Sequence, residues 1–146
     1  MKVLLSWIGS TDLKGHGEVG PICEVLKSID NISLGIFLID LERTFGPEWT
    51  GGGIRPNLKK IFPNTRFVIK RVVMNSCNDF GSIYDASSLT LRNNAVNKVY
   101  INMNSGSKIM CGSWMLAADR LPKGNGFQNP VLVSKDYGKL KYFQIN

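Results

Sequence analysis

The chain has 146 residues, 43% of them hydrophobic and 20% charged, which predicts one domain over residues 1–146 and excludes a disordered chain. No apolar run approaches the roughly 20 residues that cross a bilayer, so a membrane-spanning protein is excluded as well. The 18 Lys and Arg residues exceed the 11 Asp and Glu residues, and the formal net charge of +7 favours polyanionic partners without predicting sequence-specific binding to duplex DNA.

Strand patterns alternate with helix patterns along the chain. In chain order the expected elements are strand Lys2–Ile8, helix Val19–Ile29, strand Ser33–Leu41, helix Ile54–Phe62, strand Thr65–Val73, helix Asp79–Asn94, strand Val96–Met103, helix Lys108–Leu121, and strands Pro130–Ser134 and Leu140–Ile145. This alternation predicts an α/β fold, a Rossmann-like three-layer sandwich with a mostly parallel sheet of about six strands. The last two strands predict a C-terminal antiparallel hairpin.

Several details of these elements are further expectations. Residues 9–18 form a polar loop, and the glycine-rich segment after the second strand carries Trp49, a candidate lid or dimer contact. Asp79 caps its helix, because its carboxylate can accept a hydrogen bond from a free backbone N–H. Phe80 belongs to the core-facing side of the same helix. Helix 108–121 is apolar nearly all round, so we expect it to be deeply packed.

Cysteine and histidine usage argues against several kinds of site. Cys23, Cys77 and Cys111 are far apart, which predicts buried free thiols in a reducing cytoplasm and neither a disulfide framework nor a zinc site. His16 is the single histidine, which argues against a Ser-His-Asp triad. We therefore expect a cytoplasmic protein with no metal and no cofactor.

Three polar loops follow predicted strands. Open α/β sheets bind ligands outside the carboxyl ends of their strands, near the point where strand order reverses. Residues 9–12, 74–79 and 104–108 are all rich in hydroxyl, amide or glycine groups, and all three would meet at that edge. The sequence therefore predicts a ligand site among these loops.

The turn over Asn104–Lys108 is the strongest candidate, because it joins a strand to a buried helix. Free backbone N–H groups and the helix dipole at such a junction favour an anion. Gly106 allows close backbone approach, Ser105 and Ser107 offer hydroxyls, and Lys108 adds a cation that the dipole alone disfavours. The alternative is a serine that merely caps the helix beside a solvated lysine. The segment lacks the G-x-x-x-x-G-K-[ST] pattern, so ATP hydrolysis gains little support.

Other residues near this edge are weaker candidates. Ser10 and Thr11 could bond a phosphate or a ribose, or could belong to an ordinary turn with a solvated Asp12. Tyr84 could stack on a base, and the helix face it occupies could equally be core. The candidate ligand-binding residues are Gly9, Ser10, Thr11, Asp12, Asp79, Tyr84, Asn104, Ser105, Gly106, Ser107, Lys108 and Met110.

Residues 15–20 match the pattern G-x-G-x-x-G. A dinucleotide site needs this pattern directly after the strand, whereas six residues intervene here. Asp40 lies 25 residues past Gly15, further than the usual spacing of about 20 residues to the ribose-binding acid. NAD(P) binding therefore remains the least favoured alternative, with His16 interpreted as a loop residue.

Three segments together resemble the CARF (CRISPR-associated Rossmann fold) superfamily, and within it the RtcR-type N-terminal sensor domains. They are residues 4–12, residues 79–84, and residues 102–110 followed by Trp114. In these sensors the turn after the fourth strand reads Ser-Pro-Gly-Thr, followed by a Met and, one helical turn later, a Trp. Here residues 105–108 take that place without the proline, which leaves the shape of the phosphate loop open.

The resemblance implies a homodimeric sensor for CRISPR antiviral defence, whose two sites join across the two-fold axis. Its ligand would be a cyclic oligoadenylate or another small, RNA-derived oligonucleotide. Ser10 and Thr11 match the first ligand loop, and residues 105–108 match the second. Some members cleave their ligand without metal, so the alternative is a ring nuclease with Lys108 and Ser107 as catalytic residues. Effector domains of larger members have no counterpart in this sequence.

Overall fold

The computed structural model describes residues 1–40, 53–76 and 78–145. Within them a six-stranded sheet has the order β3-β2-β1-β4-β5-β6. Its strands are β1 (Lys2–Trp7), β2 (Ile32–Asp40), β3 (Arg66–Val72), β4 (Lys98–Asn102), β5 (Val131–Asp136) and β6 (Lys139–Gln144). Strands β1 to β5 pair in parallel, and β6 is antiparallel to β5. The expected mostly parallel sheet with a C-terminal antiparallel hairpin is confirmed.

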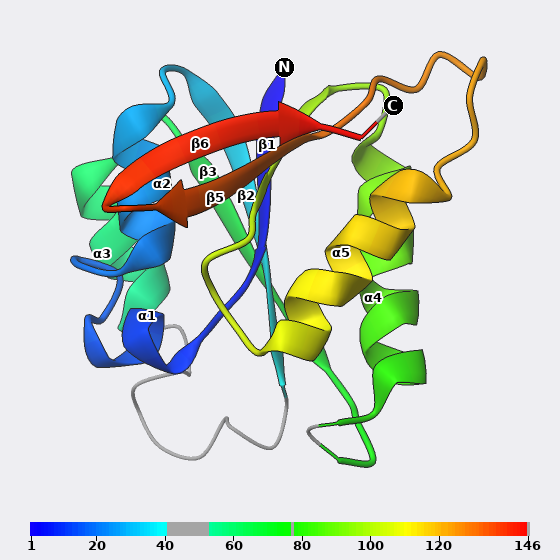
Figure 1. The fold of residues 1–146 in the computed structure, drawn as a ribbon. Helices are drawn as coiled ribbons and strands as arrows, with labels where there is room; N and C mark the ends of the chain where they lie inside the picture. Colours follow the sequence, from blue (N-terminus) through cyan, green and yellow to red (C-terminus); the bar gives the residue numbers. More distant parts are fainter. Residues whose placement is uncertain (41–52, 77, 146) are drawn as a thin grey trace.

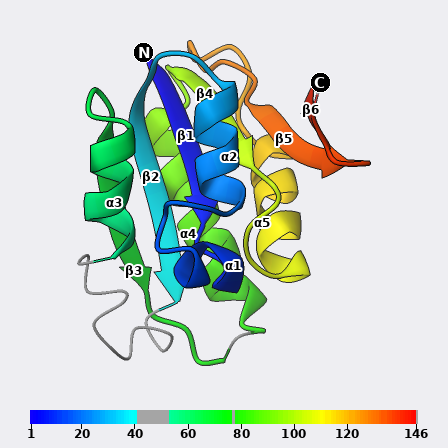
Figure 2. The same ribbon diagram turned by 90° about the vertical axis from the view of Figure 1, so that its left-hand side faces the viewer.

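Helices cover both faces of the sheet. They are α1 (Ser10–Lys14), α2 (Pro21–Ser28), α3 (Ile54–Ile61), α4 (Phe80–Asn94) and α5 (Lys108–Asp119). Figure 1 shows α1, α2 and α3 on one face and α4 and α5 on the other, and Figure 2 views the first of these faces. The result is the three-layer sandwich that the sequence predicts.

The central strand β1 contributes to two hydrophobic cores, because successive side chains of a strand point to opposite faces. Val3, Leu5 and Trp7 pack with residues of α4 and α5. Leu4, together with Ile8 just after the strand, packs with residues of α2 and α3. Burial on both faces explains why β1 is a continuous apolar run in the sequence.

The strand order reverses at β1. From β1 the chain runs outward through β2 to β3, returns through α4 to β4 on the other side of β1, and continues to β5 and β6. The loops that leave β1 and β4 therefore turn toward opposite faces of the sheet. The crevice between two such loops is where open α/β sheets bind ligands.

The segment 9–18, expected to be a loop, contains the helix α1. Asp12, the third residue of this helix, caps its N-terminus: its carboxylate accepts a hydrogen bond from the backbone N–H of Gly9 at 3.0 Å. A five-residue helix is too short to produce a readable apolar period, which is why the sequence pattern did not show it.

The loop over residues 74–79 lies apart from the other two candidate loops. It follows β3, which is the edge strand, and β2 lies between β3 and β1. It shares the carboxyl edge of the sheet with the loops after β1 and β4, but not the crevice between them. The three loops thus lie at one edge of the sheet as expected, but the loop after β3 does not border the cavity that the other two line.

Two expectations about helix burial are also wrong. Phe80 is 44% exposed, because the buried stretch of α4 begins one turn later at Ile83. Met115 on α5 is 45% exposed, because α5 packs on the sheet and on α4 and leaves one side outward. The remaining apolar face of α5, with Trp114 at its centre, is buried as expected.

The cysteine expectation is met at Cys23, which is buried. Cys111 is half-buried, and its thiol donates to the carbonyl oxygen of Met103 at 3.1 Å. Cys77 and Trp49 lie outside the described residues.

Every helix in the described part of the chain falls short of the length and hydropathy that a bilayer crossing requires.

Candidate ligand-binding site

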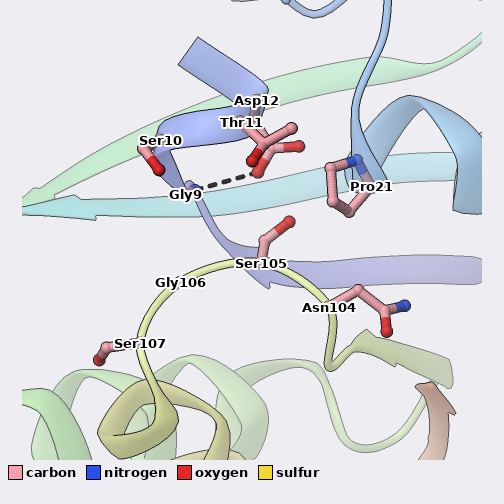
Figure 3. A pocket seen from close by; sticks show the side chains of 9 residues that line it. All are labelled: Gly9, Ser10, Thr11, Asp12, Pro21, Asn104, Ser105, Gly106 and Ser107. Atoms are coloured by element: carbon pink, nitrogen blue, oxygen red, sulfur yellow. Dashed lines mark hydrogen bonds between the residues drawn. The ribbon is translucent and has the colours of Figure 1, made fainter. Parts of the chain in front are cut away.

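A cavity of about 270 Å³ opens where β1 and β4 end (Figure 3). The loop after β1, the start of α2 and the turn before α5 line it, through Gly9, Ser10, Thr11, Asp12, Pro21, Asn104, Ser105, Gly106 and Ser107. The structure thus brings together the two loops that the sequence ranked first. Pro21 is an addition, since its position early in α2 gave no sign that it would border a site.

Two glycines allow the loop backbones to approach each other. A Cβ atom on Gly9 would lie 2.7 Å from the backbone nitrogen of Gly106. Gly106 has a φ of +90°, and a Cβ there would lie 2.8 Å from the sulfur of Met110. No larger residue fits either position without a shift of its neighbours, so the shape of the cavity depends on both glycines.

The turn before α5 has the geometry of a capped helix N-terminus. Ser107 is the N-cap, and its hydroxyl accepts a hydrogen bond from the backbone N–H of Met110 at 3.2 Å. This hydroxyl remains free to donate to a ligand, because the capping bond uses its oxygen as an acceptor. Met110 is buried beneath the turn, where it supports Gly106 and does not line the cavity.

Lys108 begins α5 and is exposed. Its side chain is not part of the cavity wall in this structure. It follows Ser107, which is part of that wall.

Asp12 is buried rather than solvated. One carboxylate oxygen accepts from the Gly9 N–H and the other from the Ile22 N–H, each at 3.0 Å. Burial raises the pKa of Asp12, although hydrogen bonds from Ser105, Ile22 and Gly9 oppose the shift. Both oxygens are engaged within the protein, so the carboxyl group mainly holds the first loop to α2.

Asp79 and Tyr84 do not line the cavity. Asp79 caps α4 as expected, accepting from the N–H of Ser82 at 3.2 Å and from the N–H of Asn75 at 3.1 Å. The bonds from Asn75 and Ser82 lower the pKa of Asp79. The Tyr84 ring stacks on Phe80 and carries the Arg120 guanidinium 5.6 Å from its centre. These contacts organise α4 and its surroundings away from the cavity.

The G-x-G-x-x-G segment follows α1 and packs against the protein itself. A Cβ on Gly17 would lie 2.9 Å from the Ile54 carbonyl oxygen, and a Cβ on Gly20 would lie 3.0 Å from an Asp12 oxygen. His16 is an exposed residue with a φ of +51°, and its carbonyl accepts from the Asn57 amide at 2.9 Å. Close packing thus accounts for these glycines without a dinucleotide.

Asn102 is the residue of this region that the sequence did not single out. It ends β4, is completely buried, and bonds both to Ser6 on β1 and to Ser105 in the turn before α5. Its signals in the sequence are an amide directly after the segment 99–101 and a place at the start of the segment 102–110 that carries the resemblance. Among the described residues, no group of three or more His, Cys, Asp and Glu side chains could hold a metal ion.

No protein-family model and no curated protein matches the chain. Among solved structures, the fold is similar to that of Enterococcus italicus Csm6 bound to cyclic hexa-2'-fluoro-hexa-dAMP, with a TM-score of 0.72 and 20% sequence identity. The match covers 97% of this chain and 36% of the Csm6 chain, so this chain spans about a third of that neighbour. At this identity the similarity shows the fold. That fold is the one that the resemblance in the sequence implies.

Proposed function

We propose that this chain is a CARF-like sensor domain that binds a cyclic oligoadenylate, or another small phosphate-bearing oligonucleotide, across a homodimer. The observation that carries the proposal is the cavity between the β1 and β4 loops, which lies at the switch point of the sheet and is lined by hydroxyls and glycines. The fold supports it, because a protein of similar fold was solved with a cyclic oligonucleotide. Cytoplasmic location and a role in CRISPR antiviral defence belong to the same proposal.

The cavity wall suits phosphate and ribose oxygens. Ser10 and Thr11 are exposed on one side, and Ser107 is exposed on the other. The N-terminus of α5 adds the positive end of a helix dipole, which favours a negative group. Lys108, which directly follows Ser107, would supply a charge-assisted hydrogen bond to the same ligand.

The size of the cavity supports a homodimer. Drug-sized ligands fill sites of about 300–1,000 Å³, and a ring of several nucleotides is larger than such a ligand. A cavity of about 270 Å³ therefore holds one part of the ring. A second copy of the same cavity, related by a two-fold axis, would hold the opposite part.

Titration calorimetry with cyclic hexa-adenylate and with cyclic tetra-adenylate tests the proposal. Wild-type protein should bind at least one of them, and Ser107→Ala or Lys108→Ala should raise Kd about tenfold or more, the expected cost of losing a hydrogen bond to a charged group. Lys123→Ala is the matched control, because it removes the same charge from an exposed loop outside the cavity. Equal binding by all variants would overturn the site, and no binding by wild type would overturn the ligand class.

A second candidate function is ring cleavage, favoured by the exposed Ser107 hydroxyl on the cavity wall beside Lys108. In this reaction the ribose 2′-hydroxyl gives up its proton as its oxygen bonds to the adjacent phosphorus. The bond from phosphorus to the 5′ oxygen breaks, the 5′ oxygen takes up a proton, and a linear product with a 2′,3′-cyclic phosphate results. The ammonium group would stabilise the charge that develops on the phosphate. Chromatography of the ring after incubation in EDTA separates the functions: a linear product that Lys108→Ala abolishes supports the enzyme, and an intact ring supports the sensor.

A further inference from the structure

Asn102 occupies a position where a polar side chain needs a specific reason. It is the last residue of β4 and is completely buried, next to β1 on one side and β5 on the other. The preceding strand residues Val99 and Ile101 are apolar and buried. A buried carboxamide is costly unless its donors and acceptors are all paired.

The carboxamide of Asn102 is fully paired. Its Nδ2 donates to the hydroxyl of Ser6 at 3.1 Å and to the hydroxyl of Ser105 at 2.9 Å. Its Oδ1 accepts from the backbone N–H and from the side-chain Nδ2 of Asn104, at 3.0 Å and 3.1 Å. Two donor bonds and two acceptor bonds use its whole capacity, so these partners fix its orientation.

Ser105 also faces the first ligand loop. A serine hydroxyl has one proton, and the Ser105 oxygen already accepts from Asn102, so that proton remains available for the carboxyl group of Asp12. Figure 3 shows the Ser105 side chain pointing toward Asp12. Asp12 in turn accepts from the N–H groups of Gly9 and Ile22.

A second branch runs from Asn102 to β5. The Asn104 Oδ1 accepts from the backbone N–H of Lys135 at 2.8 Å, and its Nδ2 also reaches the Val133 carbonyl oxygen at 3.4 Å. The Asn104 side chain thus extends the pairing of β4 with β5 beyond the end of the ladder at Asn102 and Val133. It borders the cavity while its polar atoms are held by the protein.

We propose that Asn102 is a positioning residue of the ligand site, which fixes the first ligand loop, the turn before α5 and the end of β5 in one arrangement without touching the ligand. This inference rests on the proposed function for its ligand and on the observed hydrogen bonds for its geometry. Asn102 can hold these three segments together because its amide both donates and accepts hydrogen bonds. An aspartate at position 102 would match it in size and would have no donor.

The consequence of Asn102→Asp follows from the single proton of Ser105. A carboxylate at position 102 would accept that proton, and it would no longer be available to Asp12. A second change, Ser105→Ala, removes the same link at its other end. The double variant Asn102→Asp/Ser105→Ala should therefore lose little more than Asn102→Asp alone, whereas two independent structural defects would add.

The experiment measures the Kd for cyclic hexa-adenylate and the free energy of unfolding in urea for wild type, Asn102→Asp, the double variant and Asn94→Asp. Asn94 is the matched control, a buried asparagine near the C-terminal end of α4 whose amide donates to Thr90. We expect Asn102→Asp to raise Kd at least about tenfold, the double variant to bind about as weakly as Asn102→Asp, and Asn94→Asp to leave Kd unchanged. Wild-type affinity in Asn102→Asp, or the same loss in Asn94→Asp, would overturn the proposal.

Amide hydrogen exchange without ligand keeps this test independent of the proposed function. The N–H groups of Gly9 and Ile22 should exchange faster in Asn102→Asp than in Asn94→Asp, relative to the global stability of each variant. If wild type binds no oligoadenylate, the proposed function fails and this exchange result decides the positioning role alone. If Asn102→Asp does not fold, Ser105→Ala replaces it, because this variant removes the same link between Asn102 and Asp12. Unchanged amide exchange at Gly9 and Ile22 in Ser105→Ala would then overturn the proposal.

Discussion

At the residue scale, Gly106 determines how closely the turn before α5 can approach its surroundings. Its φ of +90° is disfavoured for residues with a Cβ, and the space where a Cβ would lie is taken by the Met110 sulfur at 2.8 Å and the Trp7 Cβ at 3.2 Å. Backbone conformation and packing therefore both require glycine at this position. A glycine with a positive φ but with open space around its Cβ position allows the two effects to be measured separately.

We predict that Gly106→Ala lowers the free energy of unfolding by roughly 2–5 kcal/mol, combining about 1–2 kcal/mol for the positive φ with about 1–3 kcal/mol for overpacking. Gly124→Ala is the matched control, because its φ is +86° and no atom lies within 4 Å of the added Cβ. The control should lose about 1–2 kcal/mol. Urea denaturation of the two variants measures the difference, and equal losses would contradict the packing argument.

Asp12 makes stability depend on pH in the sense opposite to that of a salt-bridged carboxylate. Its pKa is raised by burial above the ordinary value of 3.8, so the folded chain holds the proton more strongly than the unfolded chain. The stabilising contribution is therefore complete below the ordinary value and is lost as pH rises through the raised pKa.

Urea denaturation of wild type and Asp12→Asn across the acidic and neutral range checks this sign, since the amide does not titrate. The free energy of unfolding of wild type, relative to Asp12→Asn, should fall as pH rises through the raised pKa of Asp12. A relative stability that rises with pH would show that the three hydrogen bonds outweigh burial and that the pKa is lowered instead.

Individual residues of the cavity differ in how far the sequence could predict them. Gly106 and Ser107 were predictable, because a glycine and a hydroxyl between a strand and a helix point to a capped N-terminus. The direction of Lys108 was not, because it depends on how α5 is rotated against the sheet. The roles of Asp12 and Asn102 were not predictable either, because a polar residue at a strand end looks solvated until the neighbouring elements bury it.

At the element scale, length decided which helices the sequence could reveal. Helix α4 has 15 residues and α5 has 12, and both were expected within about two residues of their ends. Helix α1 has five residues and depends on the contacts of the buried Asp12 carboxylate, so no local sequence pattern predicted it. The site uses both kinds of element, since α5 supplies a long dipole and α1 supplies two exposed hydroxyls.

Helix α5 contains one residue that weakens it without serving the site. Gly112 lies within the helix, is exposed, and has no atom within 4 Å of the position of a Cβ. We predict that Gly112→Ala stabilises the fold by about 0.5–1 kcal/mol and raises Tm by roughly 1–4 °C, because alanine loses less backbone entropy in a helix.

A thermal melt of Gly112→Ala measures this effect, and Gly35→Ala in β2 serves as the contrast. A Cβ on Gly35 would lie 2.8 Å from the Phe37 ring and 3.0 Å from the Phe67 ring, so this variant should lower Tm. The affinity for cyclic hexa-adenylate should be unchanged in Gly112→Ala. A lower Tm for Gly112→Ala would mean that α5 bends or packs at this point in a way that alanine disturbs.

At the scale of the whole molecule, alternation of strands and helices was enough to predict the mostly parallel sheet and its C-terminal hairpin. Alternation could not predict which loops are neighbours, because that depends on the strand order β3-β2-β1-β4-β5-β6. The order separates the loop after β3 from the crevice. It also leaves most of the positive charge away from the cavity, on segments such as α3 and β3, where it can attract an anionic ligand over distance but cannot contact it.

The proposed homodimer leads to a prediction about stoichiometry. Cyclic hexa-adenylate is a ring of six identical nucleotides and therefore has a two-fold axis. A two-fold dimer presents the same cavity twice, so both copies can hold the ring in the same way. Because one cavity of about 270 Å³ holds a part of such a ring, we expect one ring to bind for every two chains.

Titration calorimetry combined with light scattering measures this ratio and the mass of the complex. Saturation at one ring for two chains, with the mass of a dimer, is the expected result. Ligand that binds the dimer alone should also raise Tm with ligand concentration and make the dimer persist to lower protein concentration, since it stabilises the assembled state. Saturation at one ring per chain with a monomer mass would show that a single cavity suffices and would remove the second copy from the site.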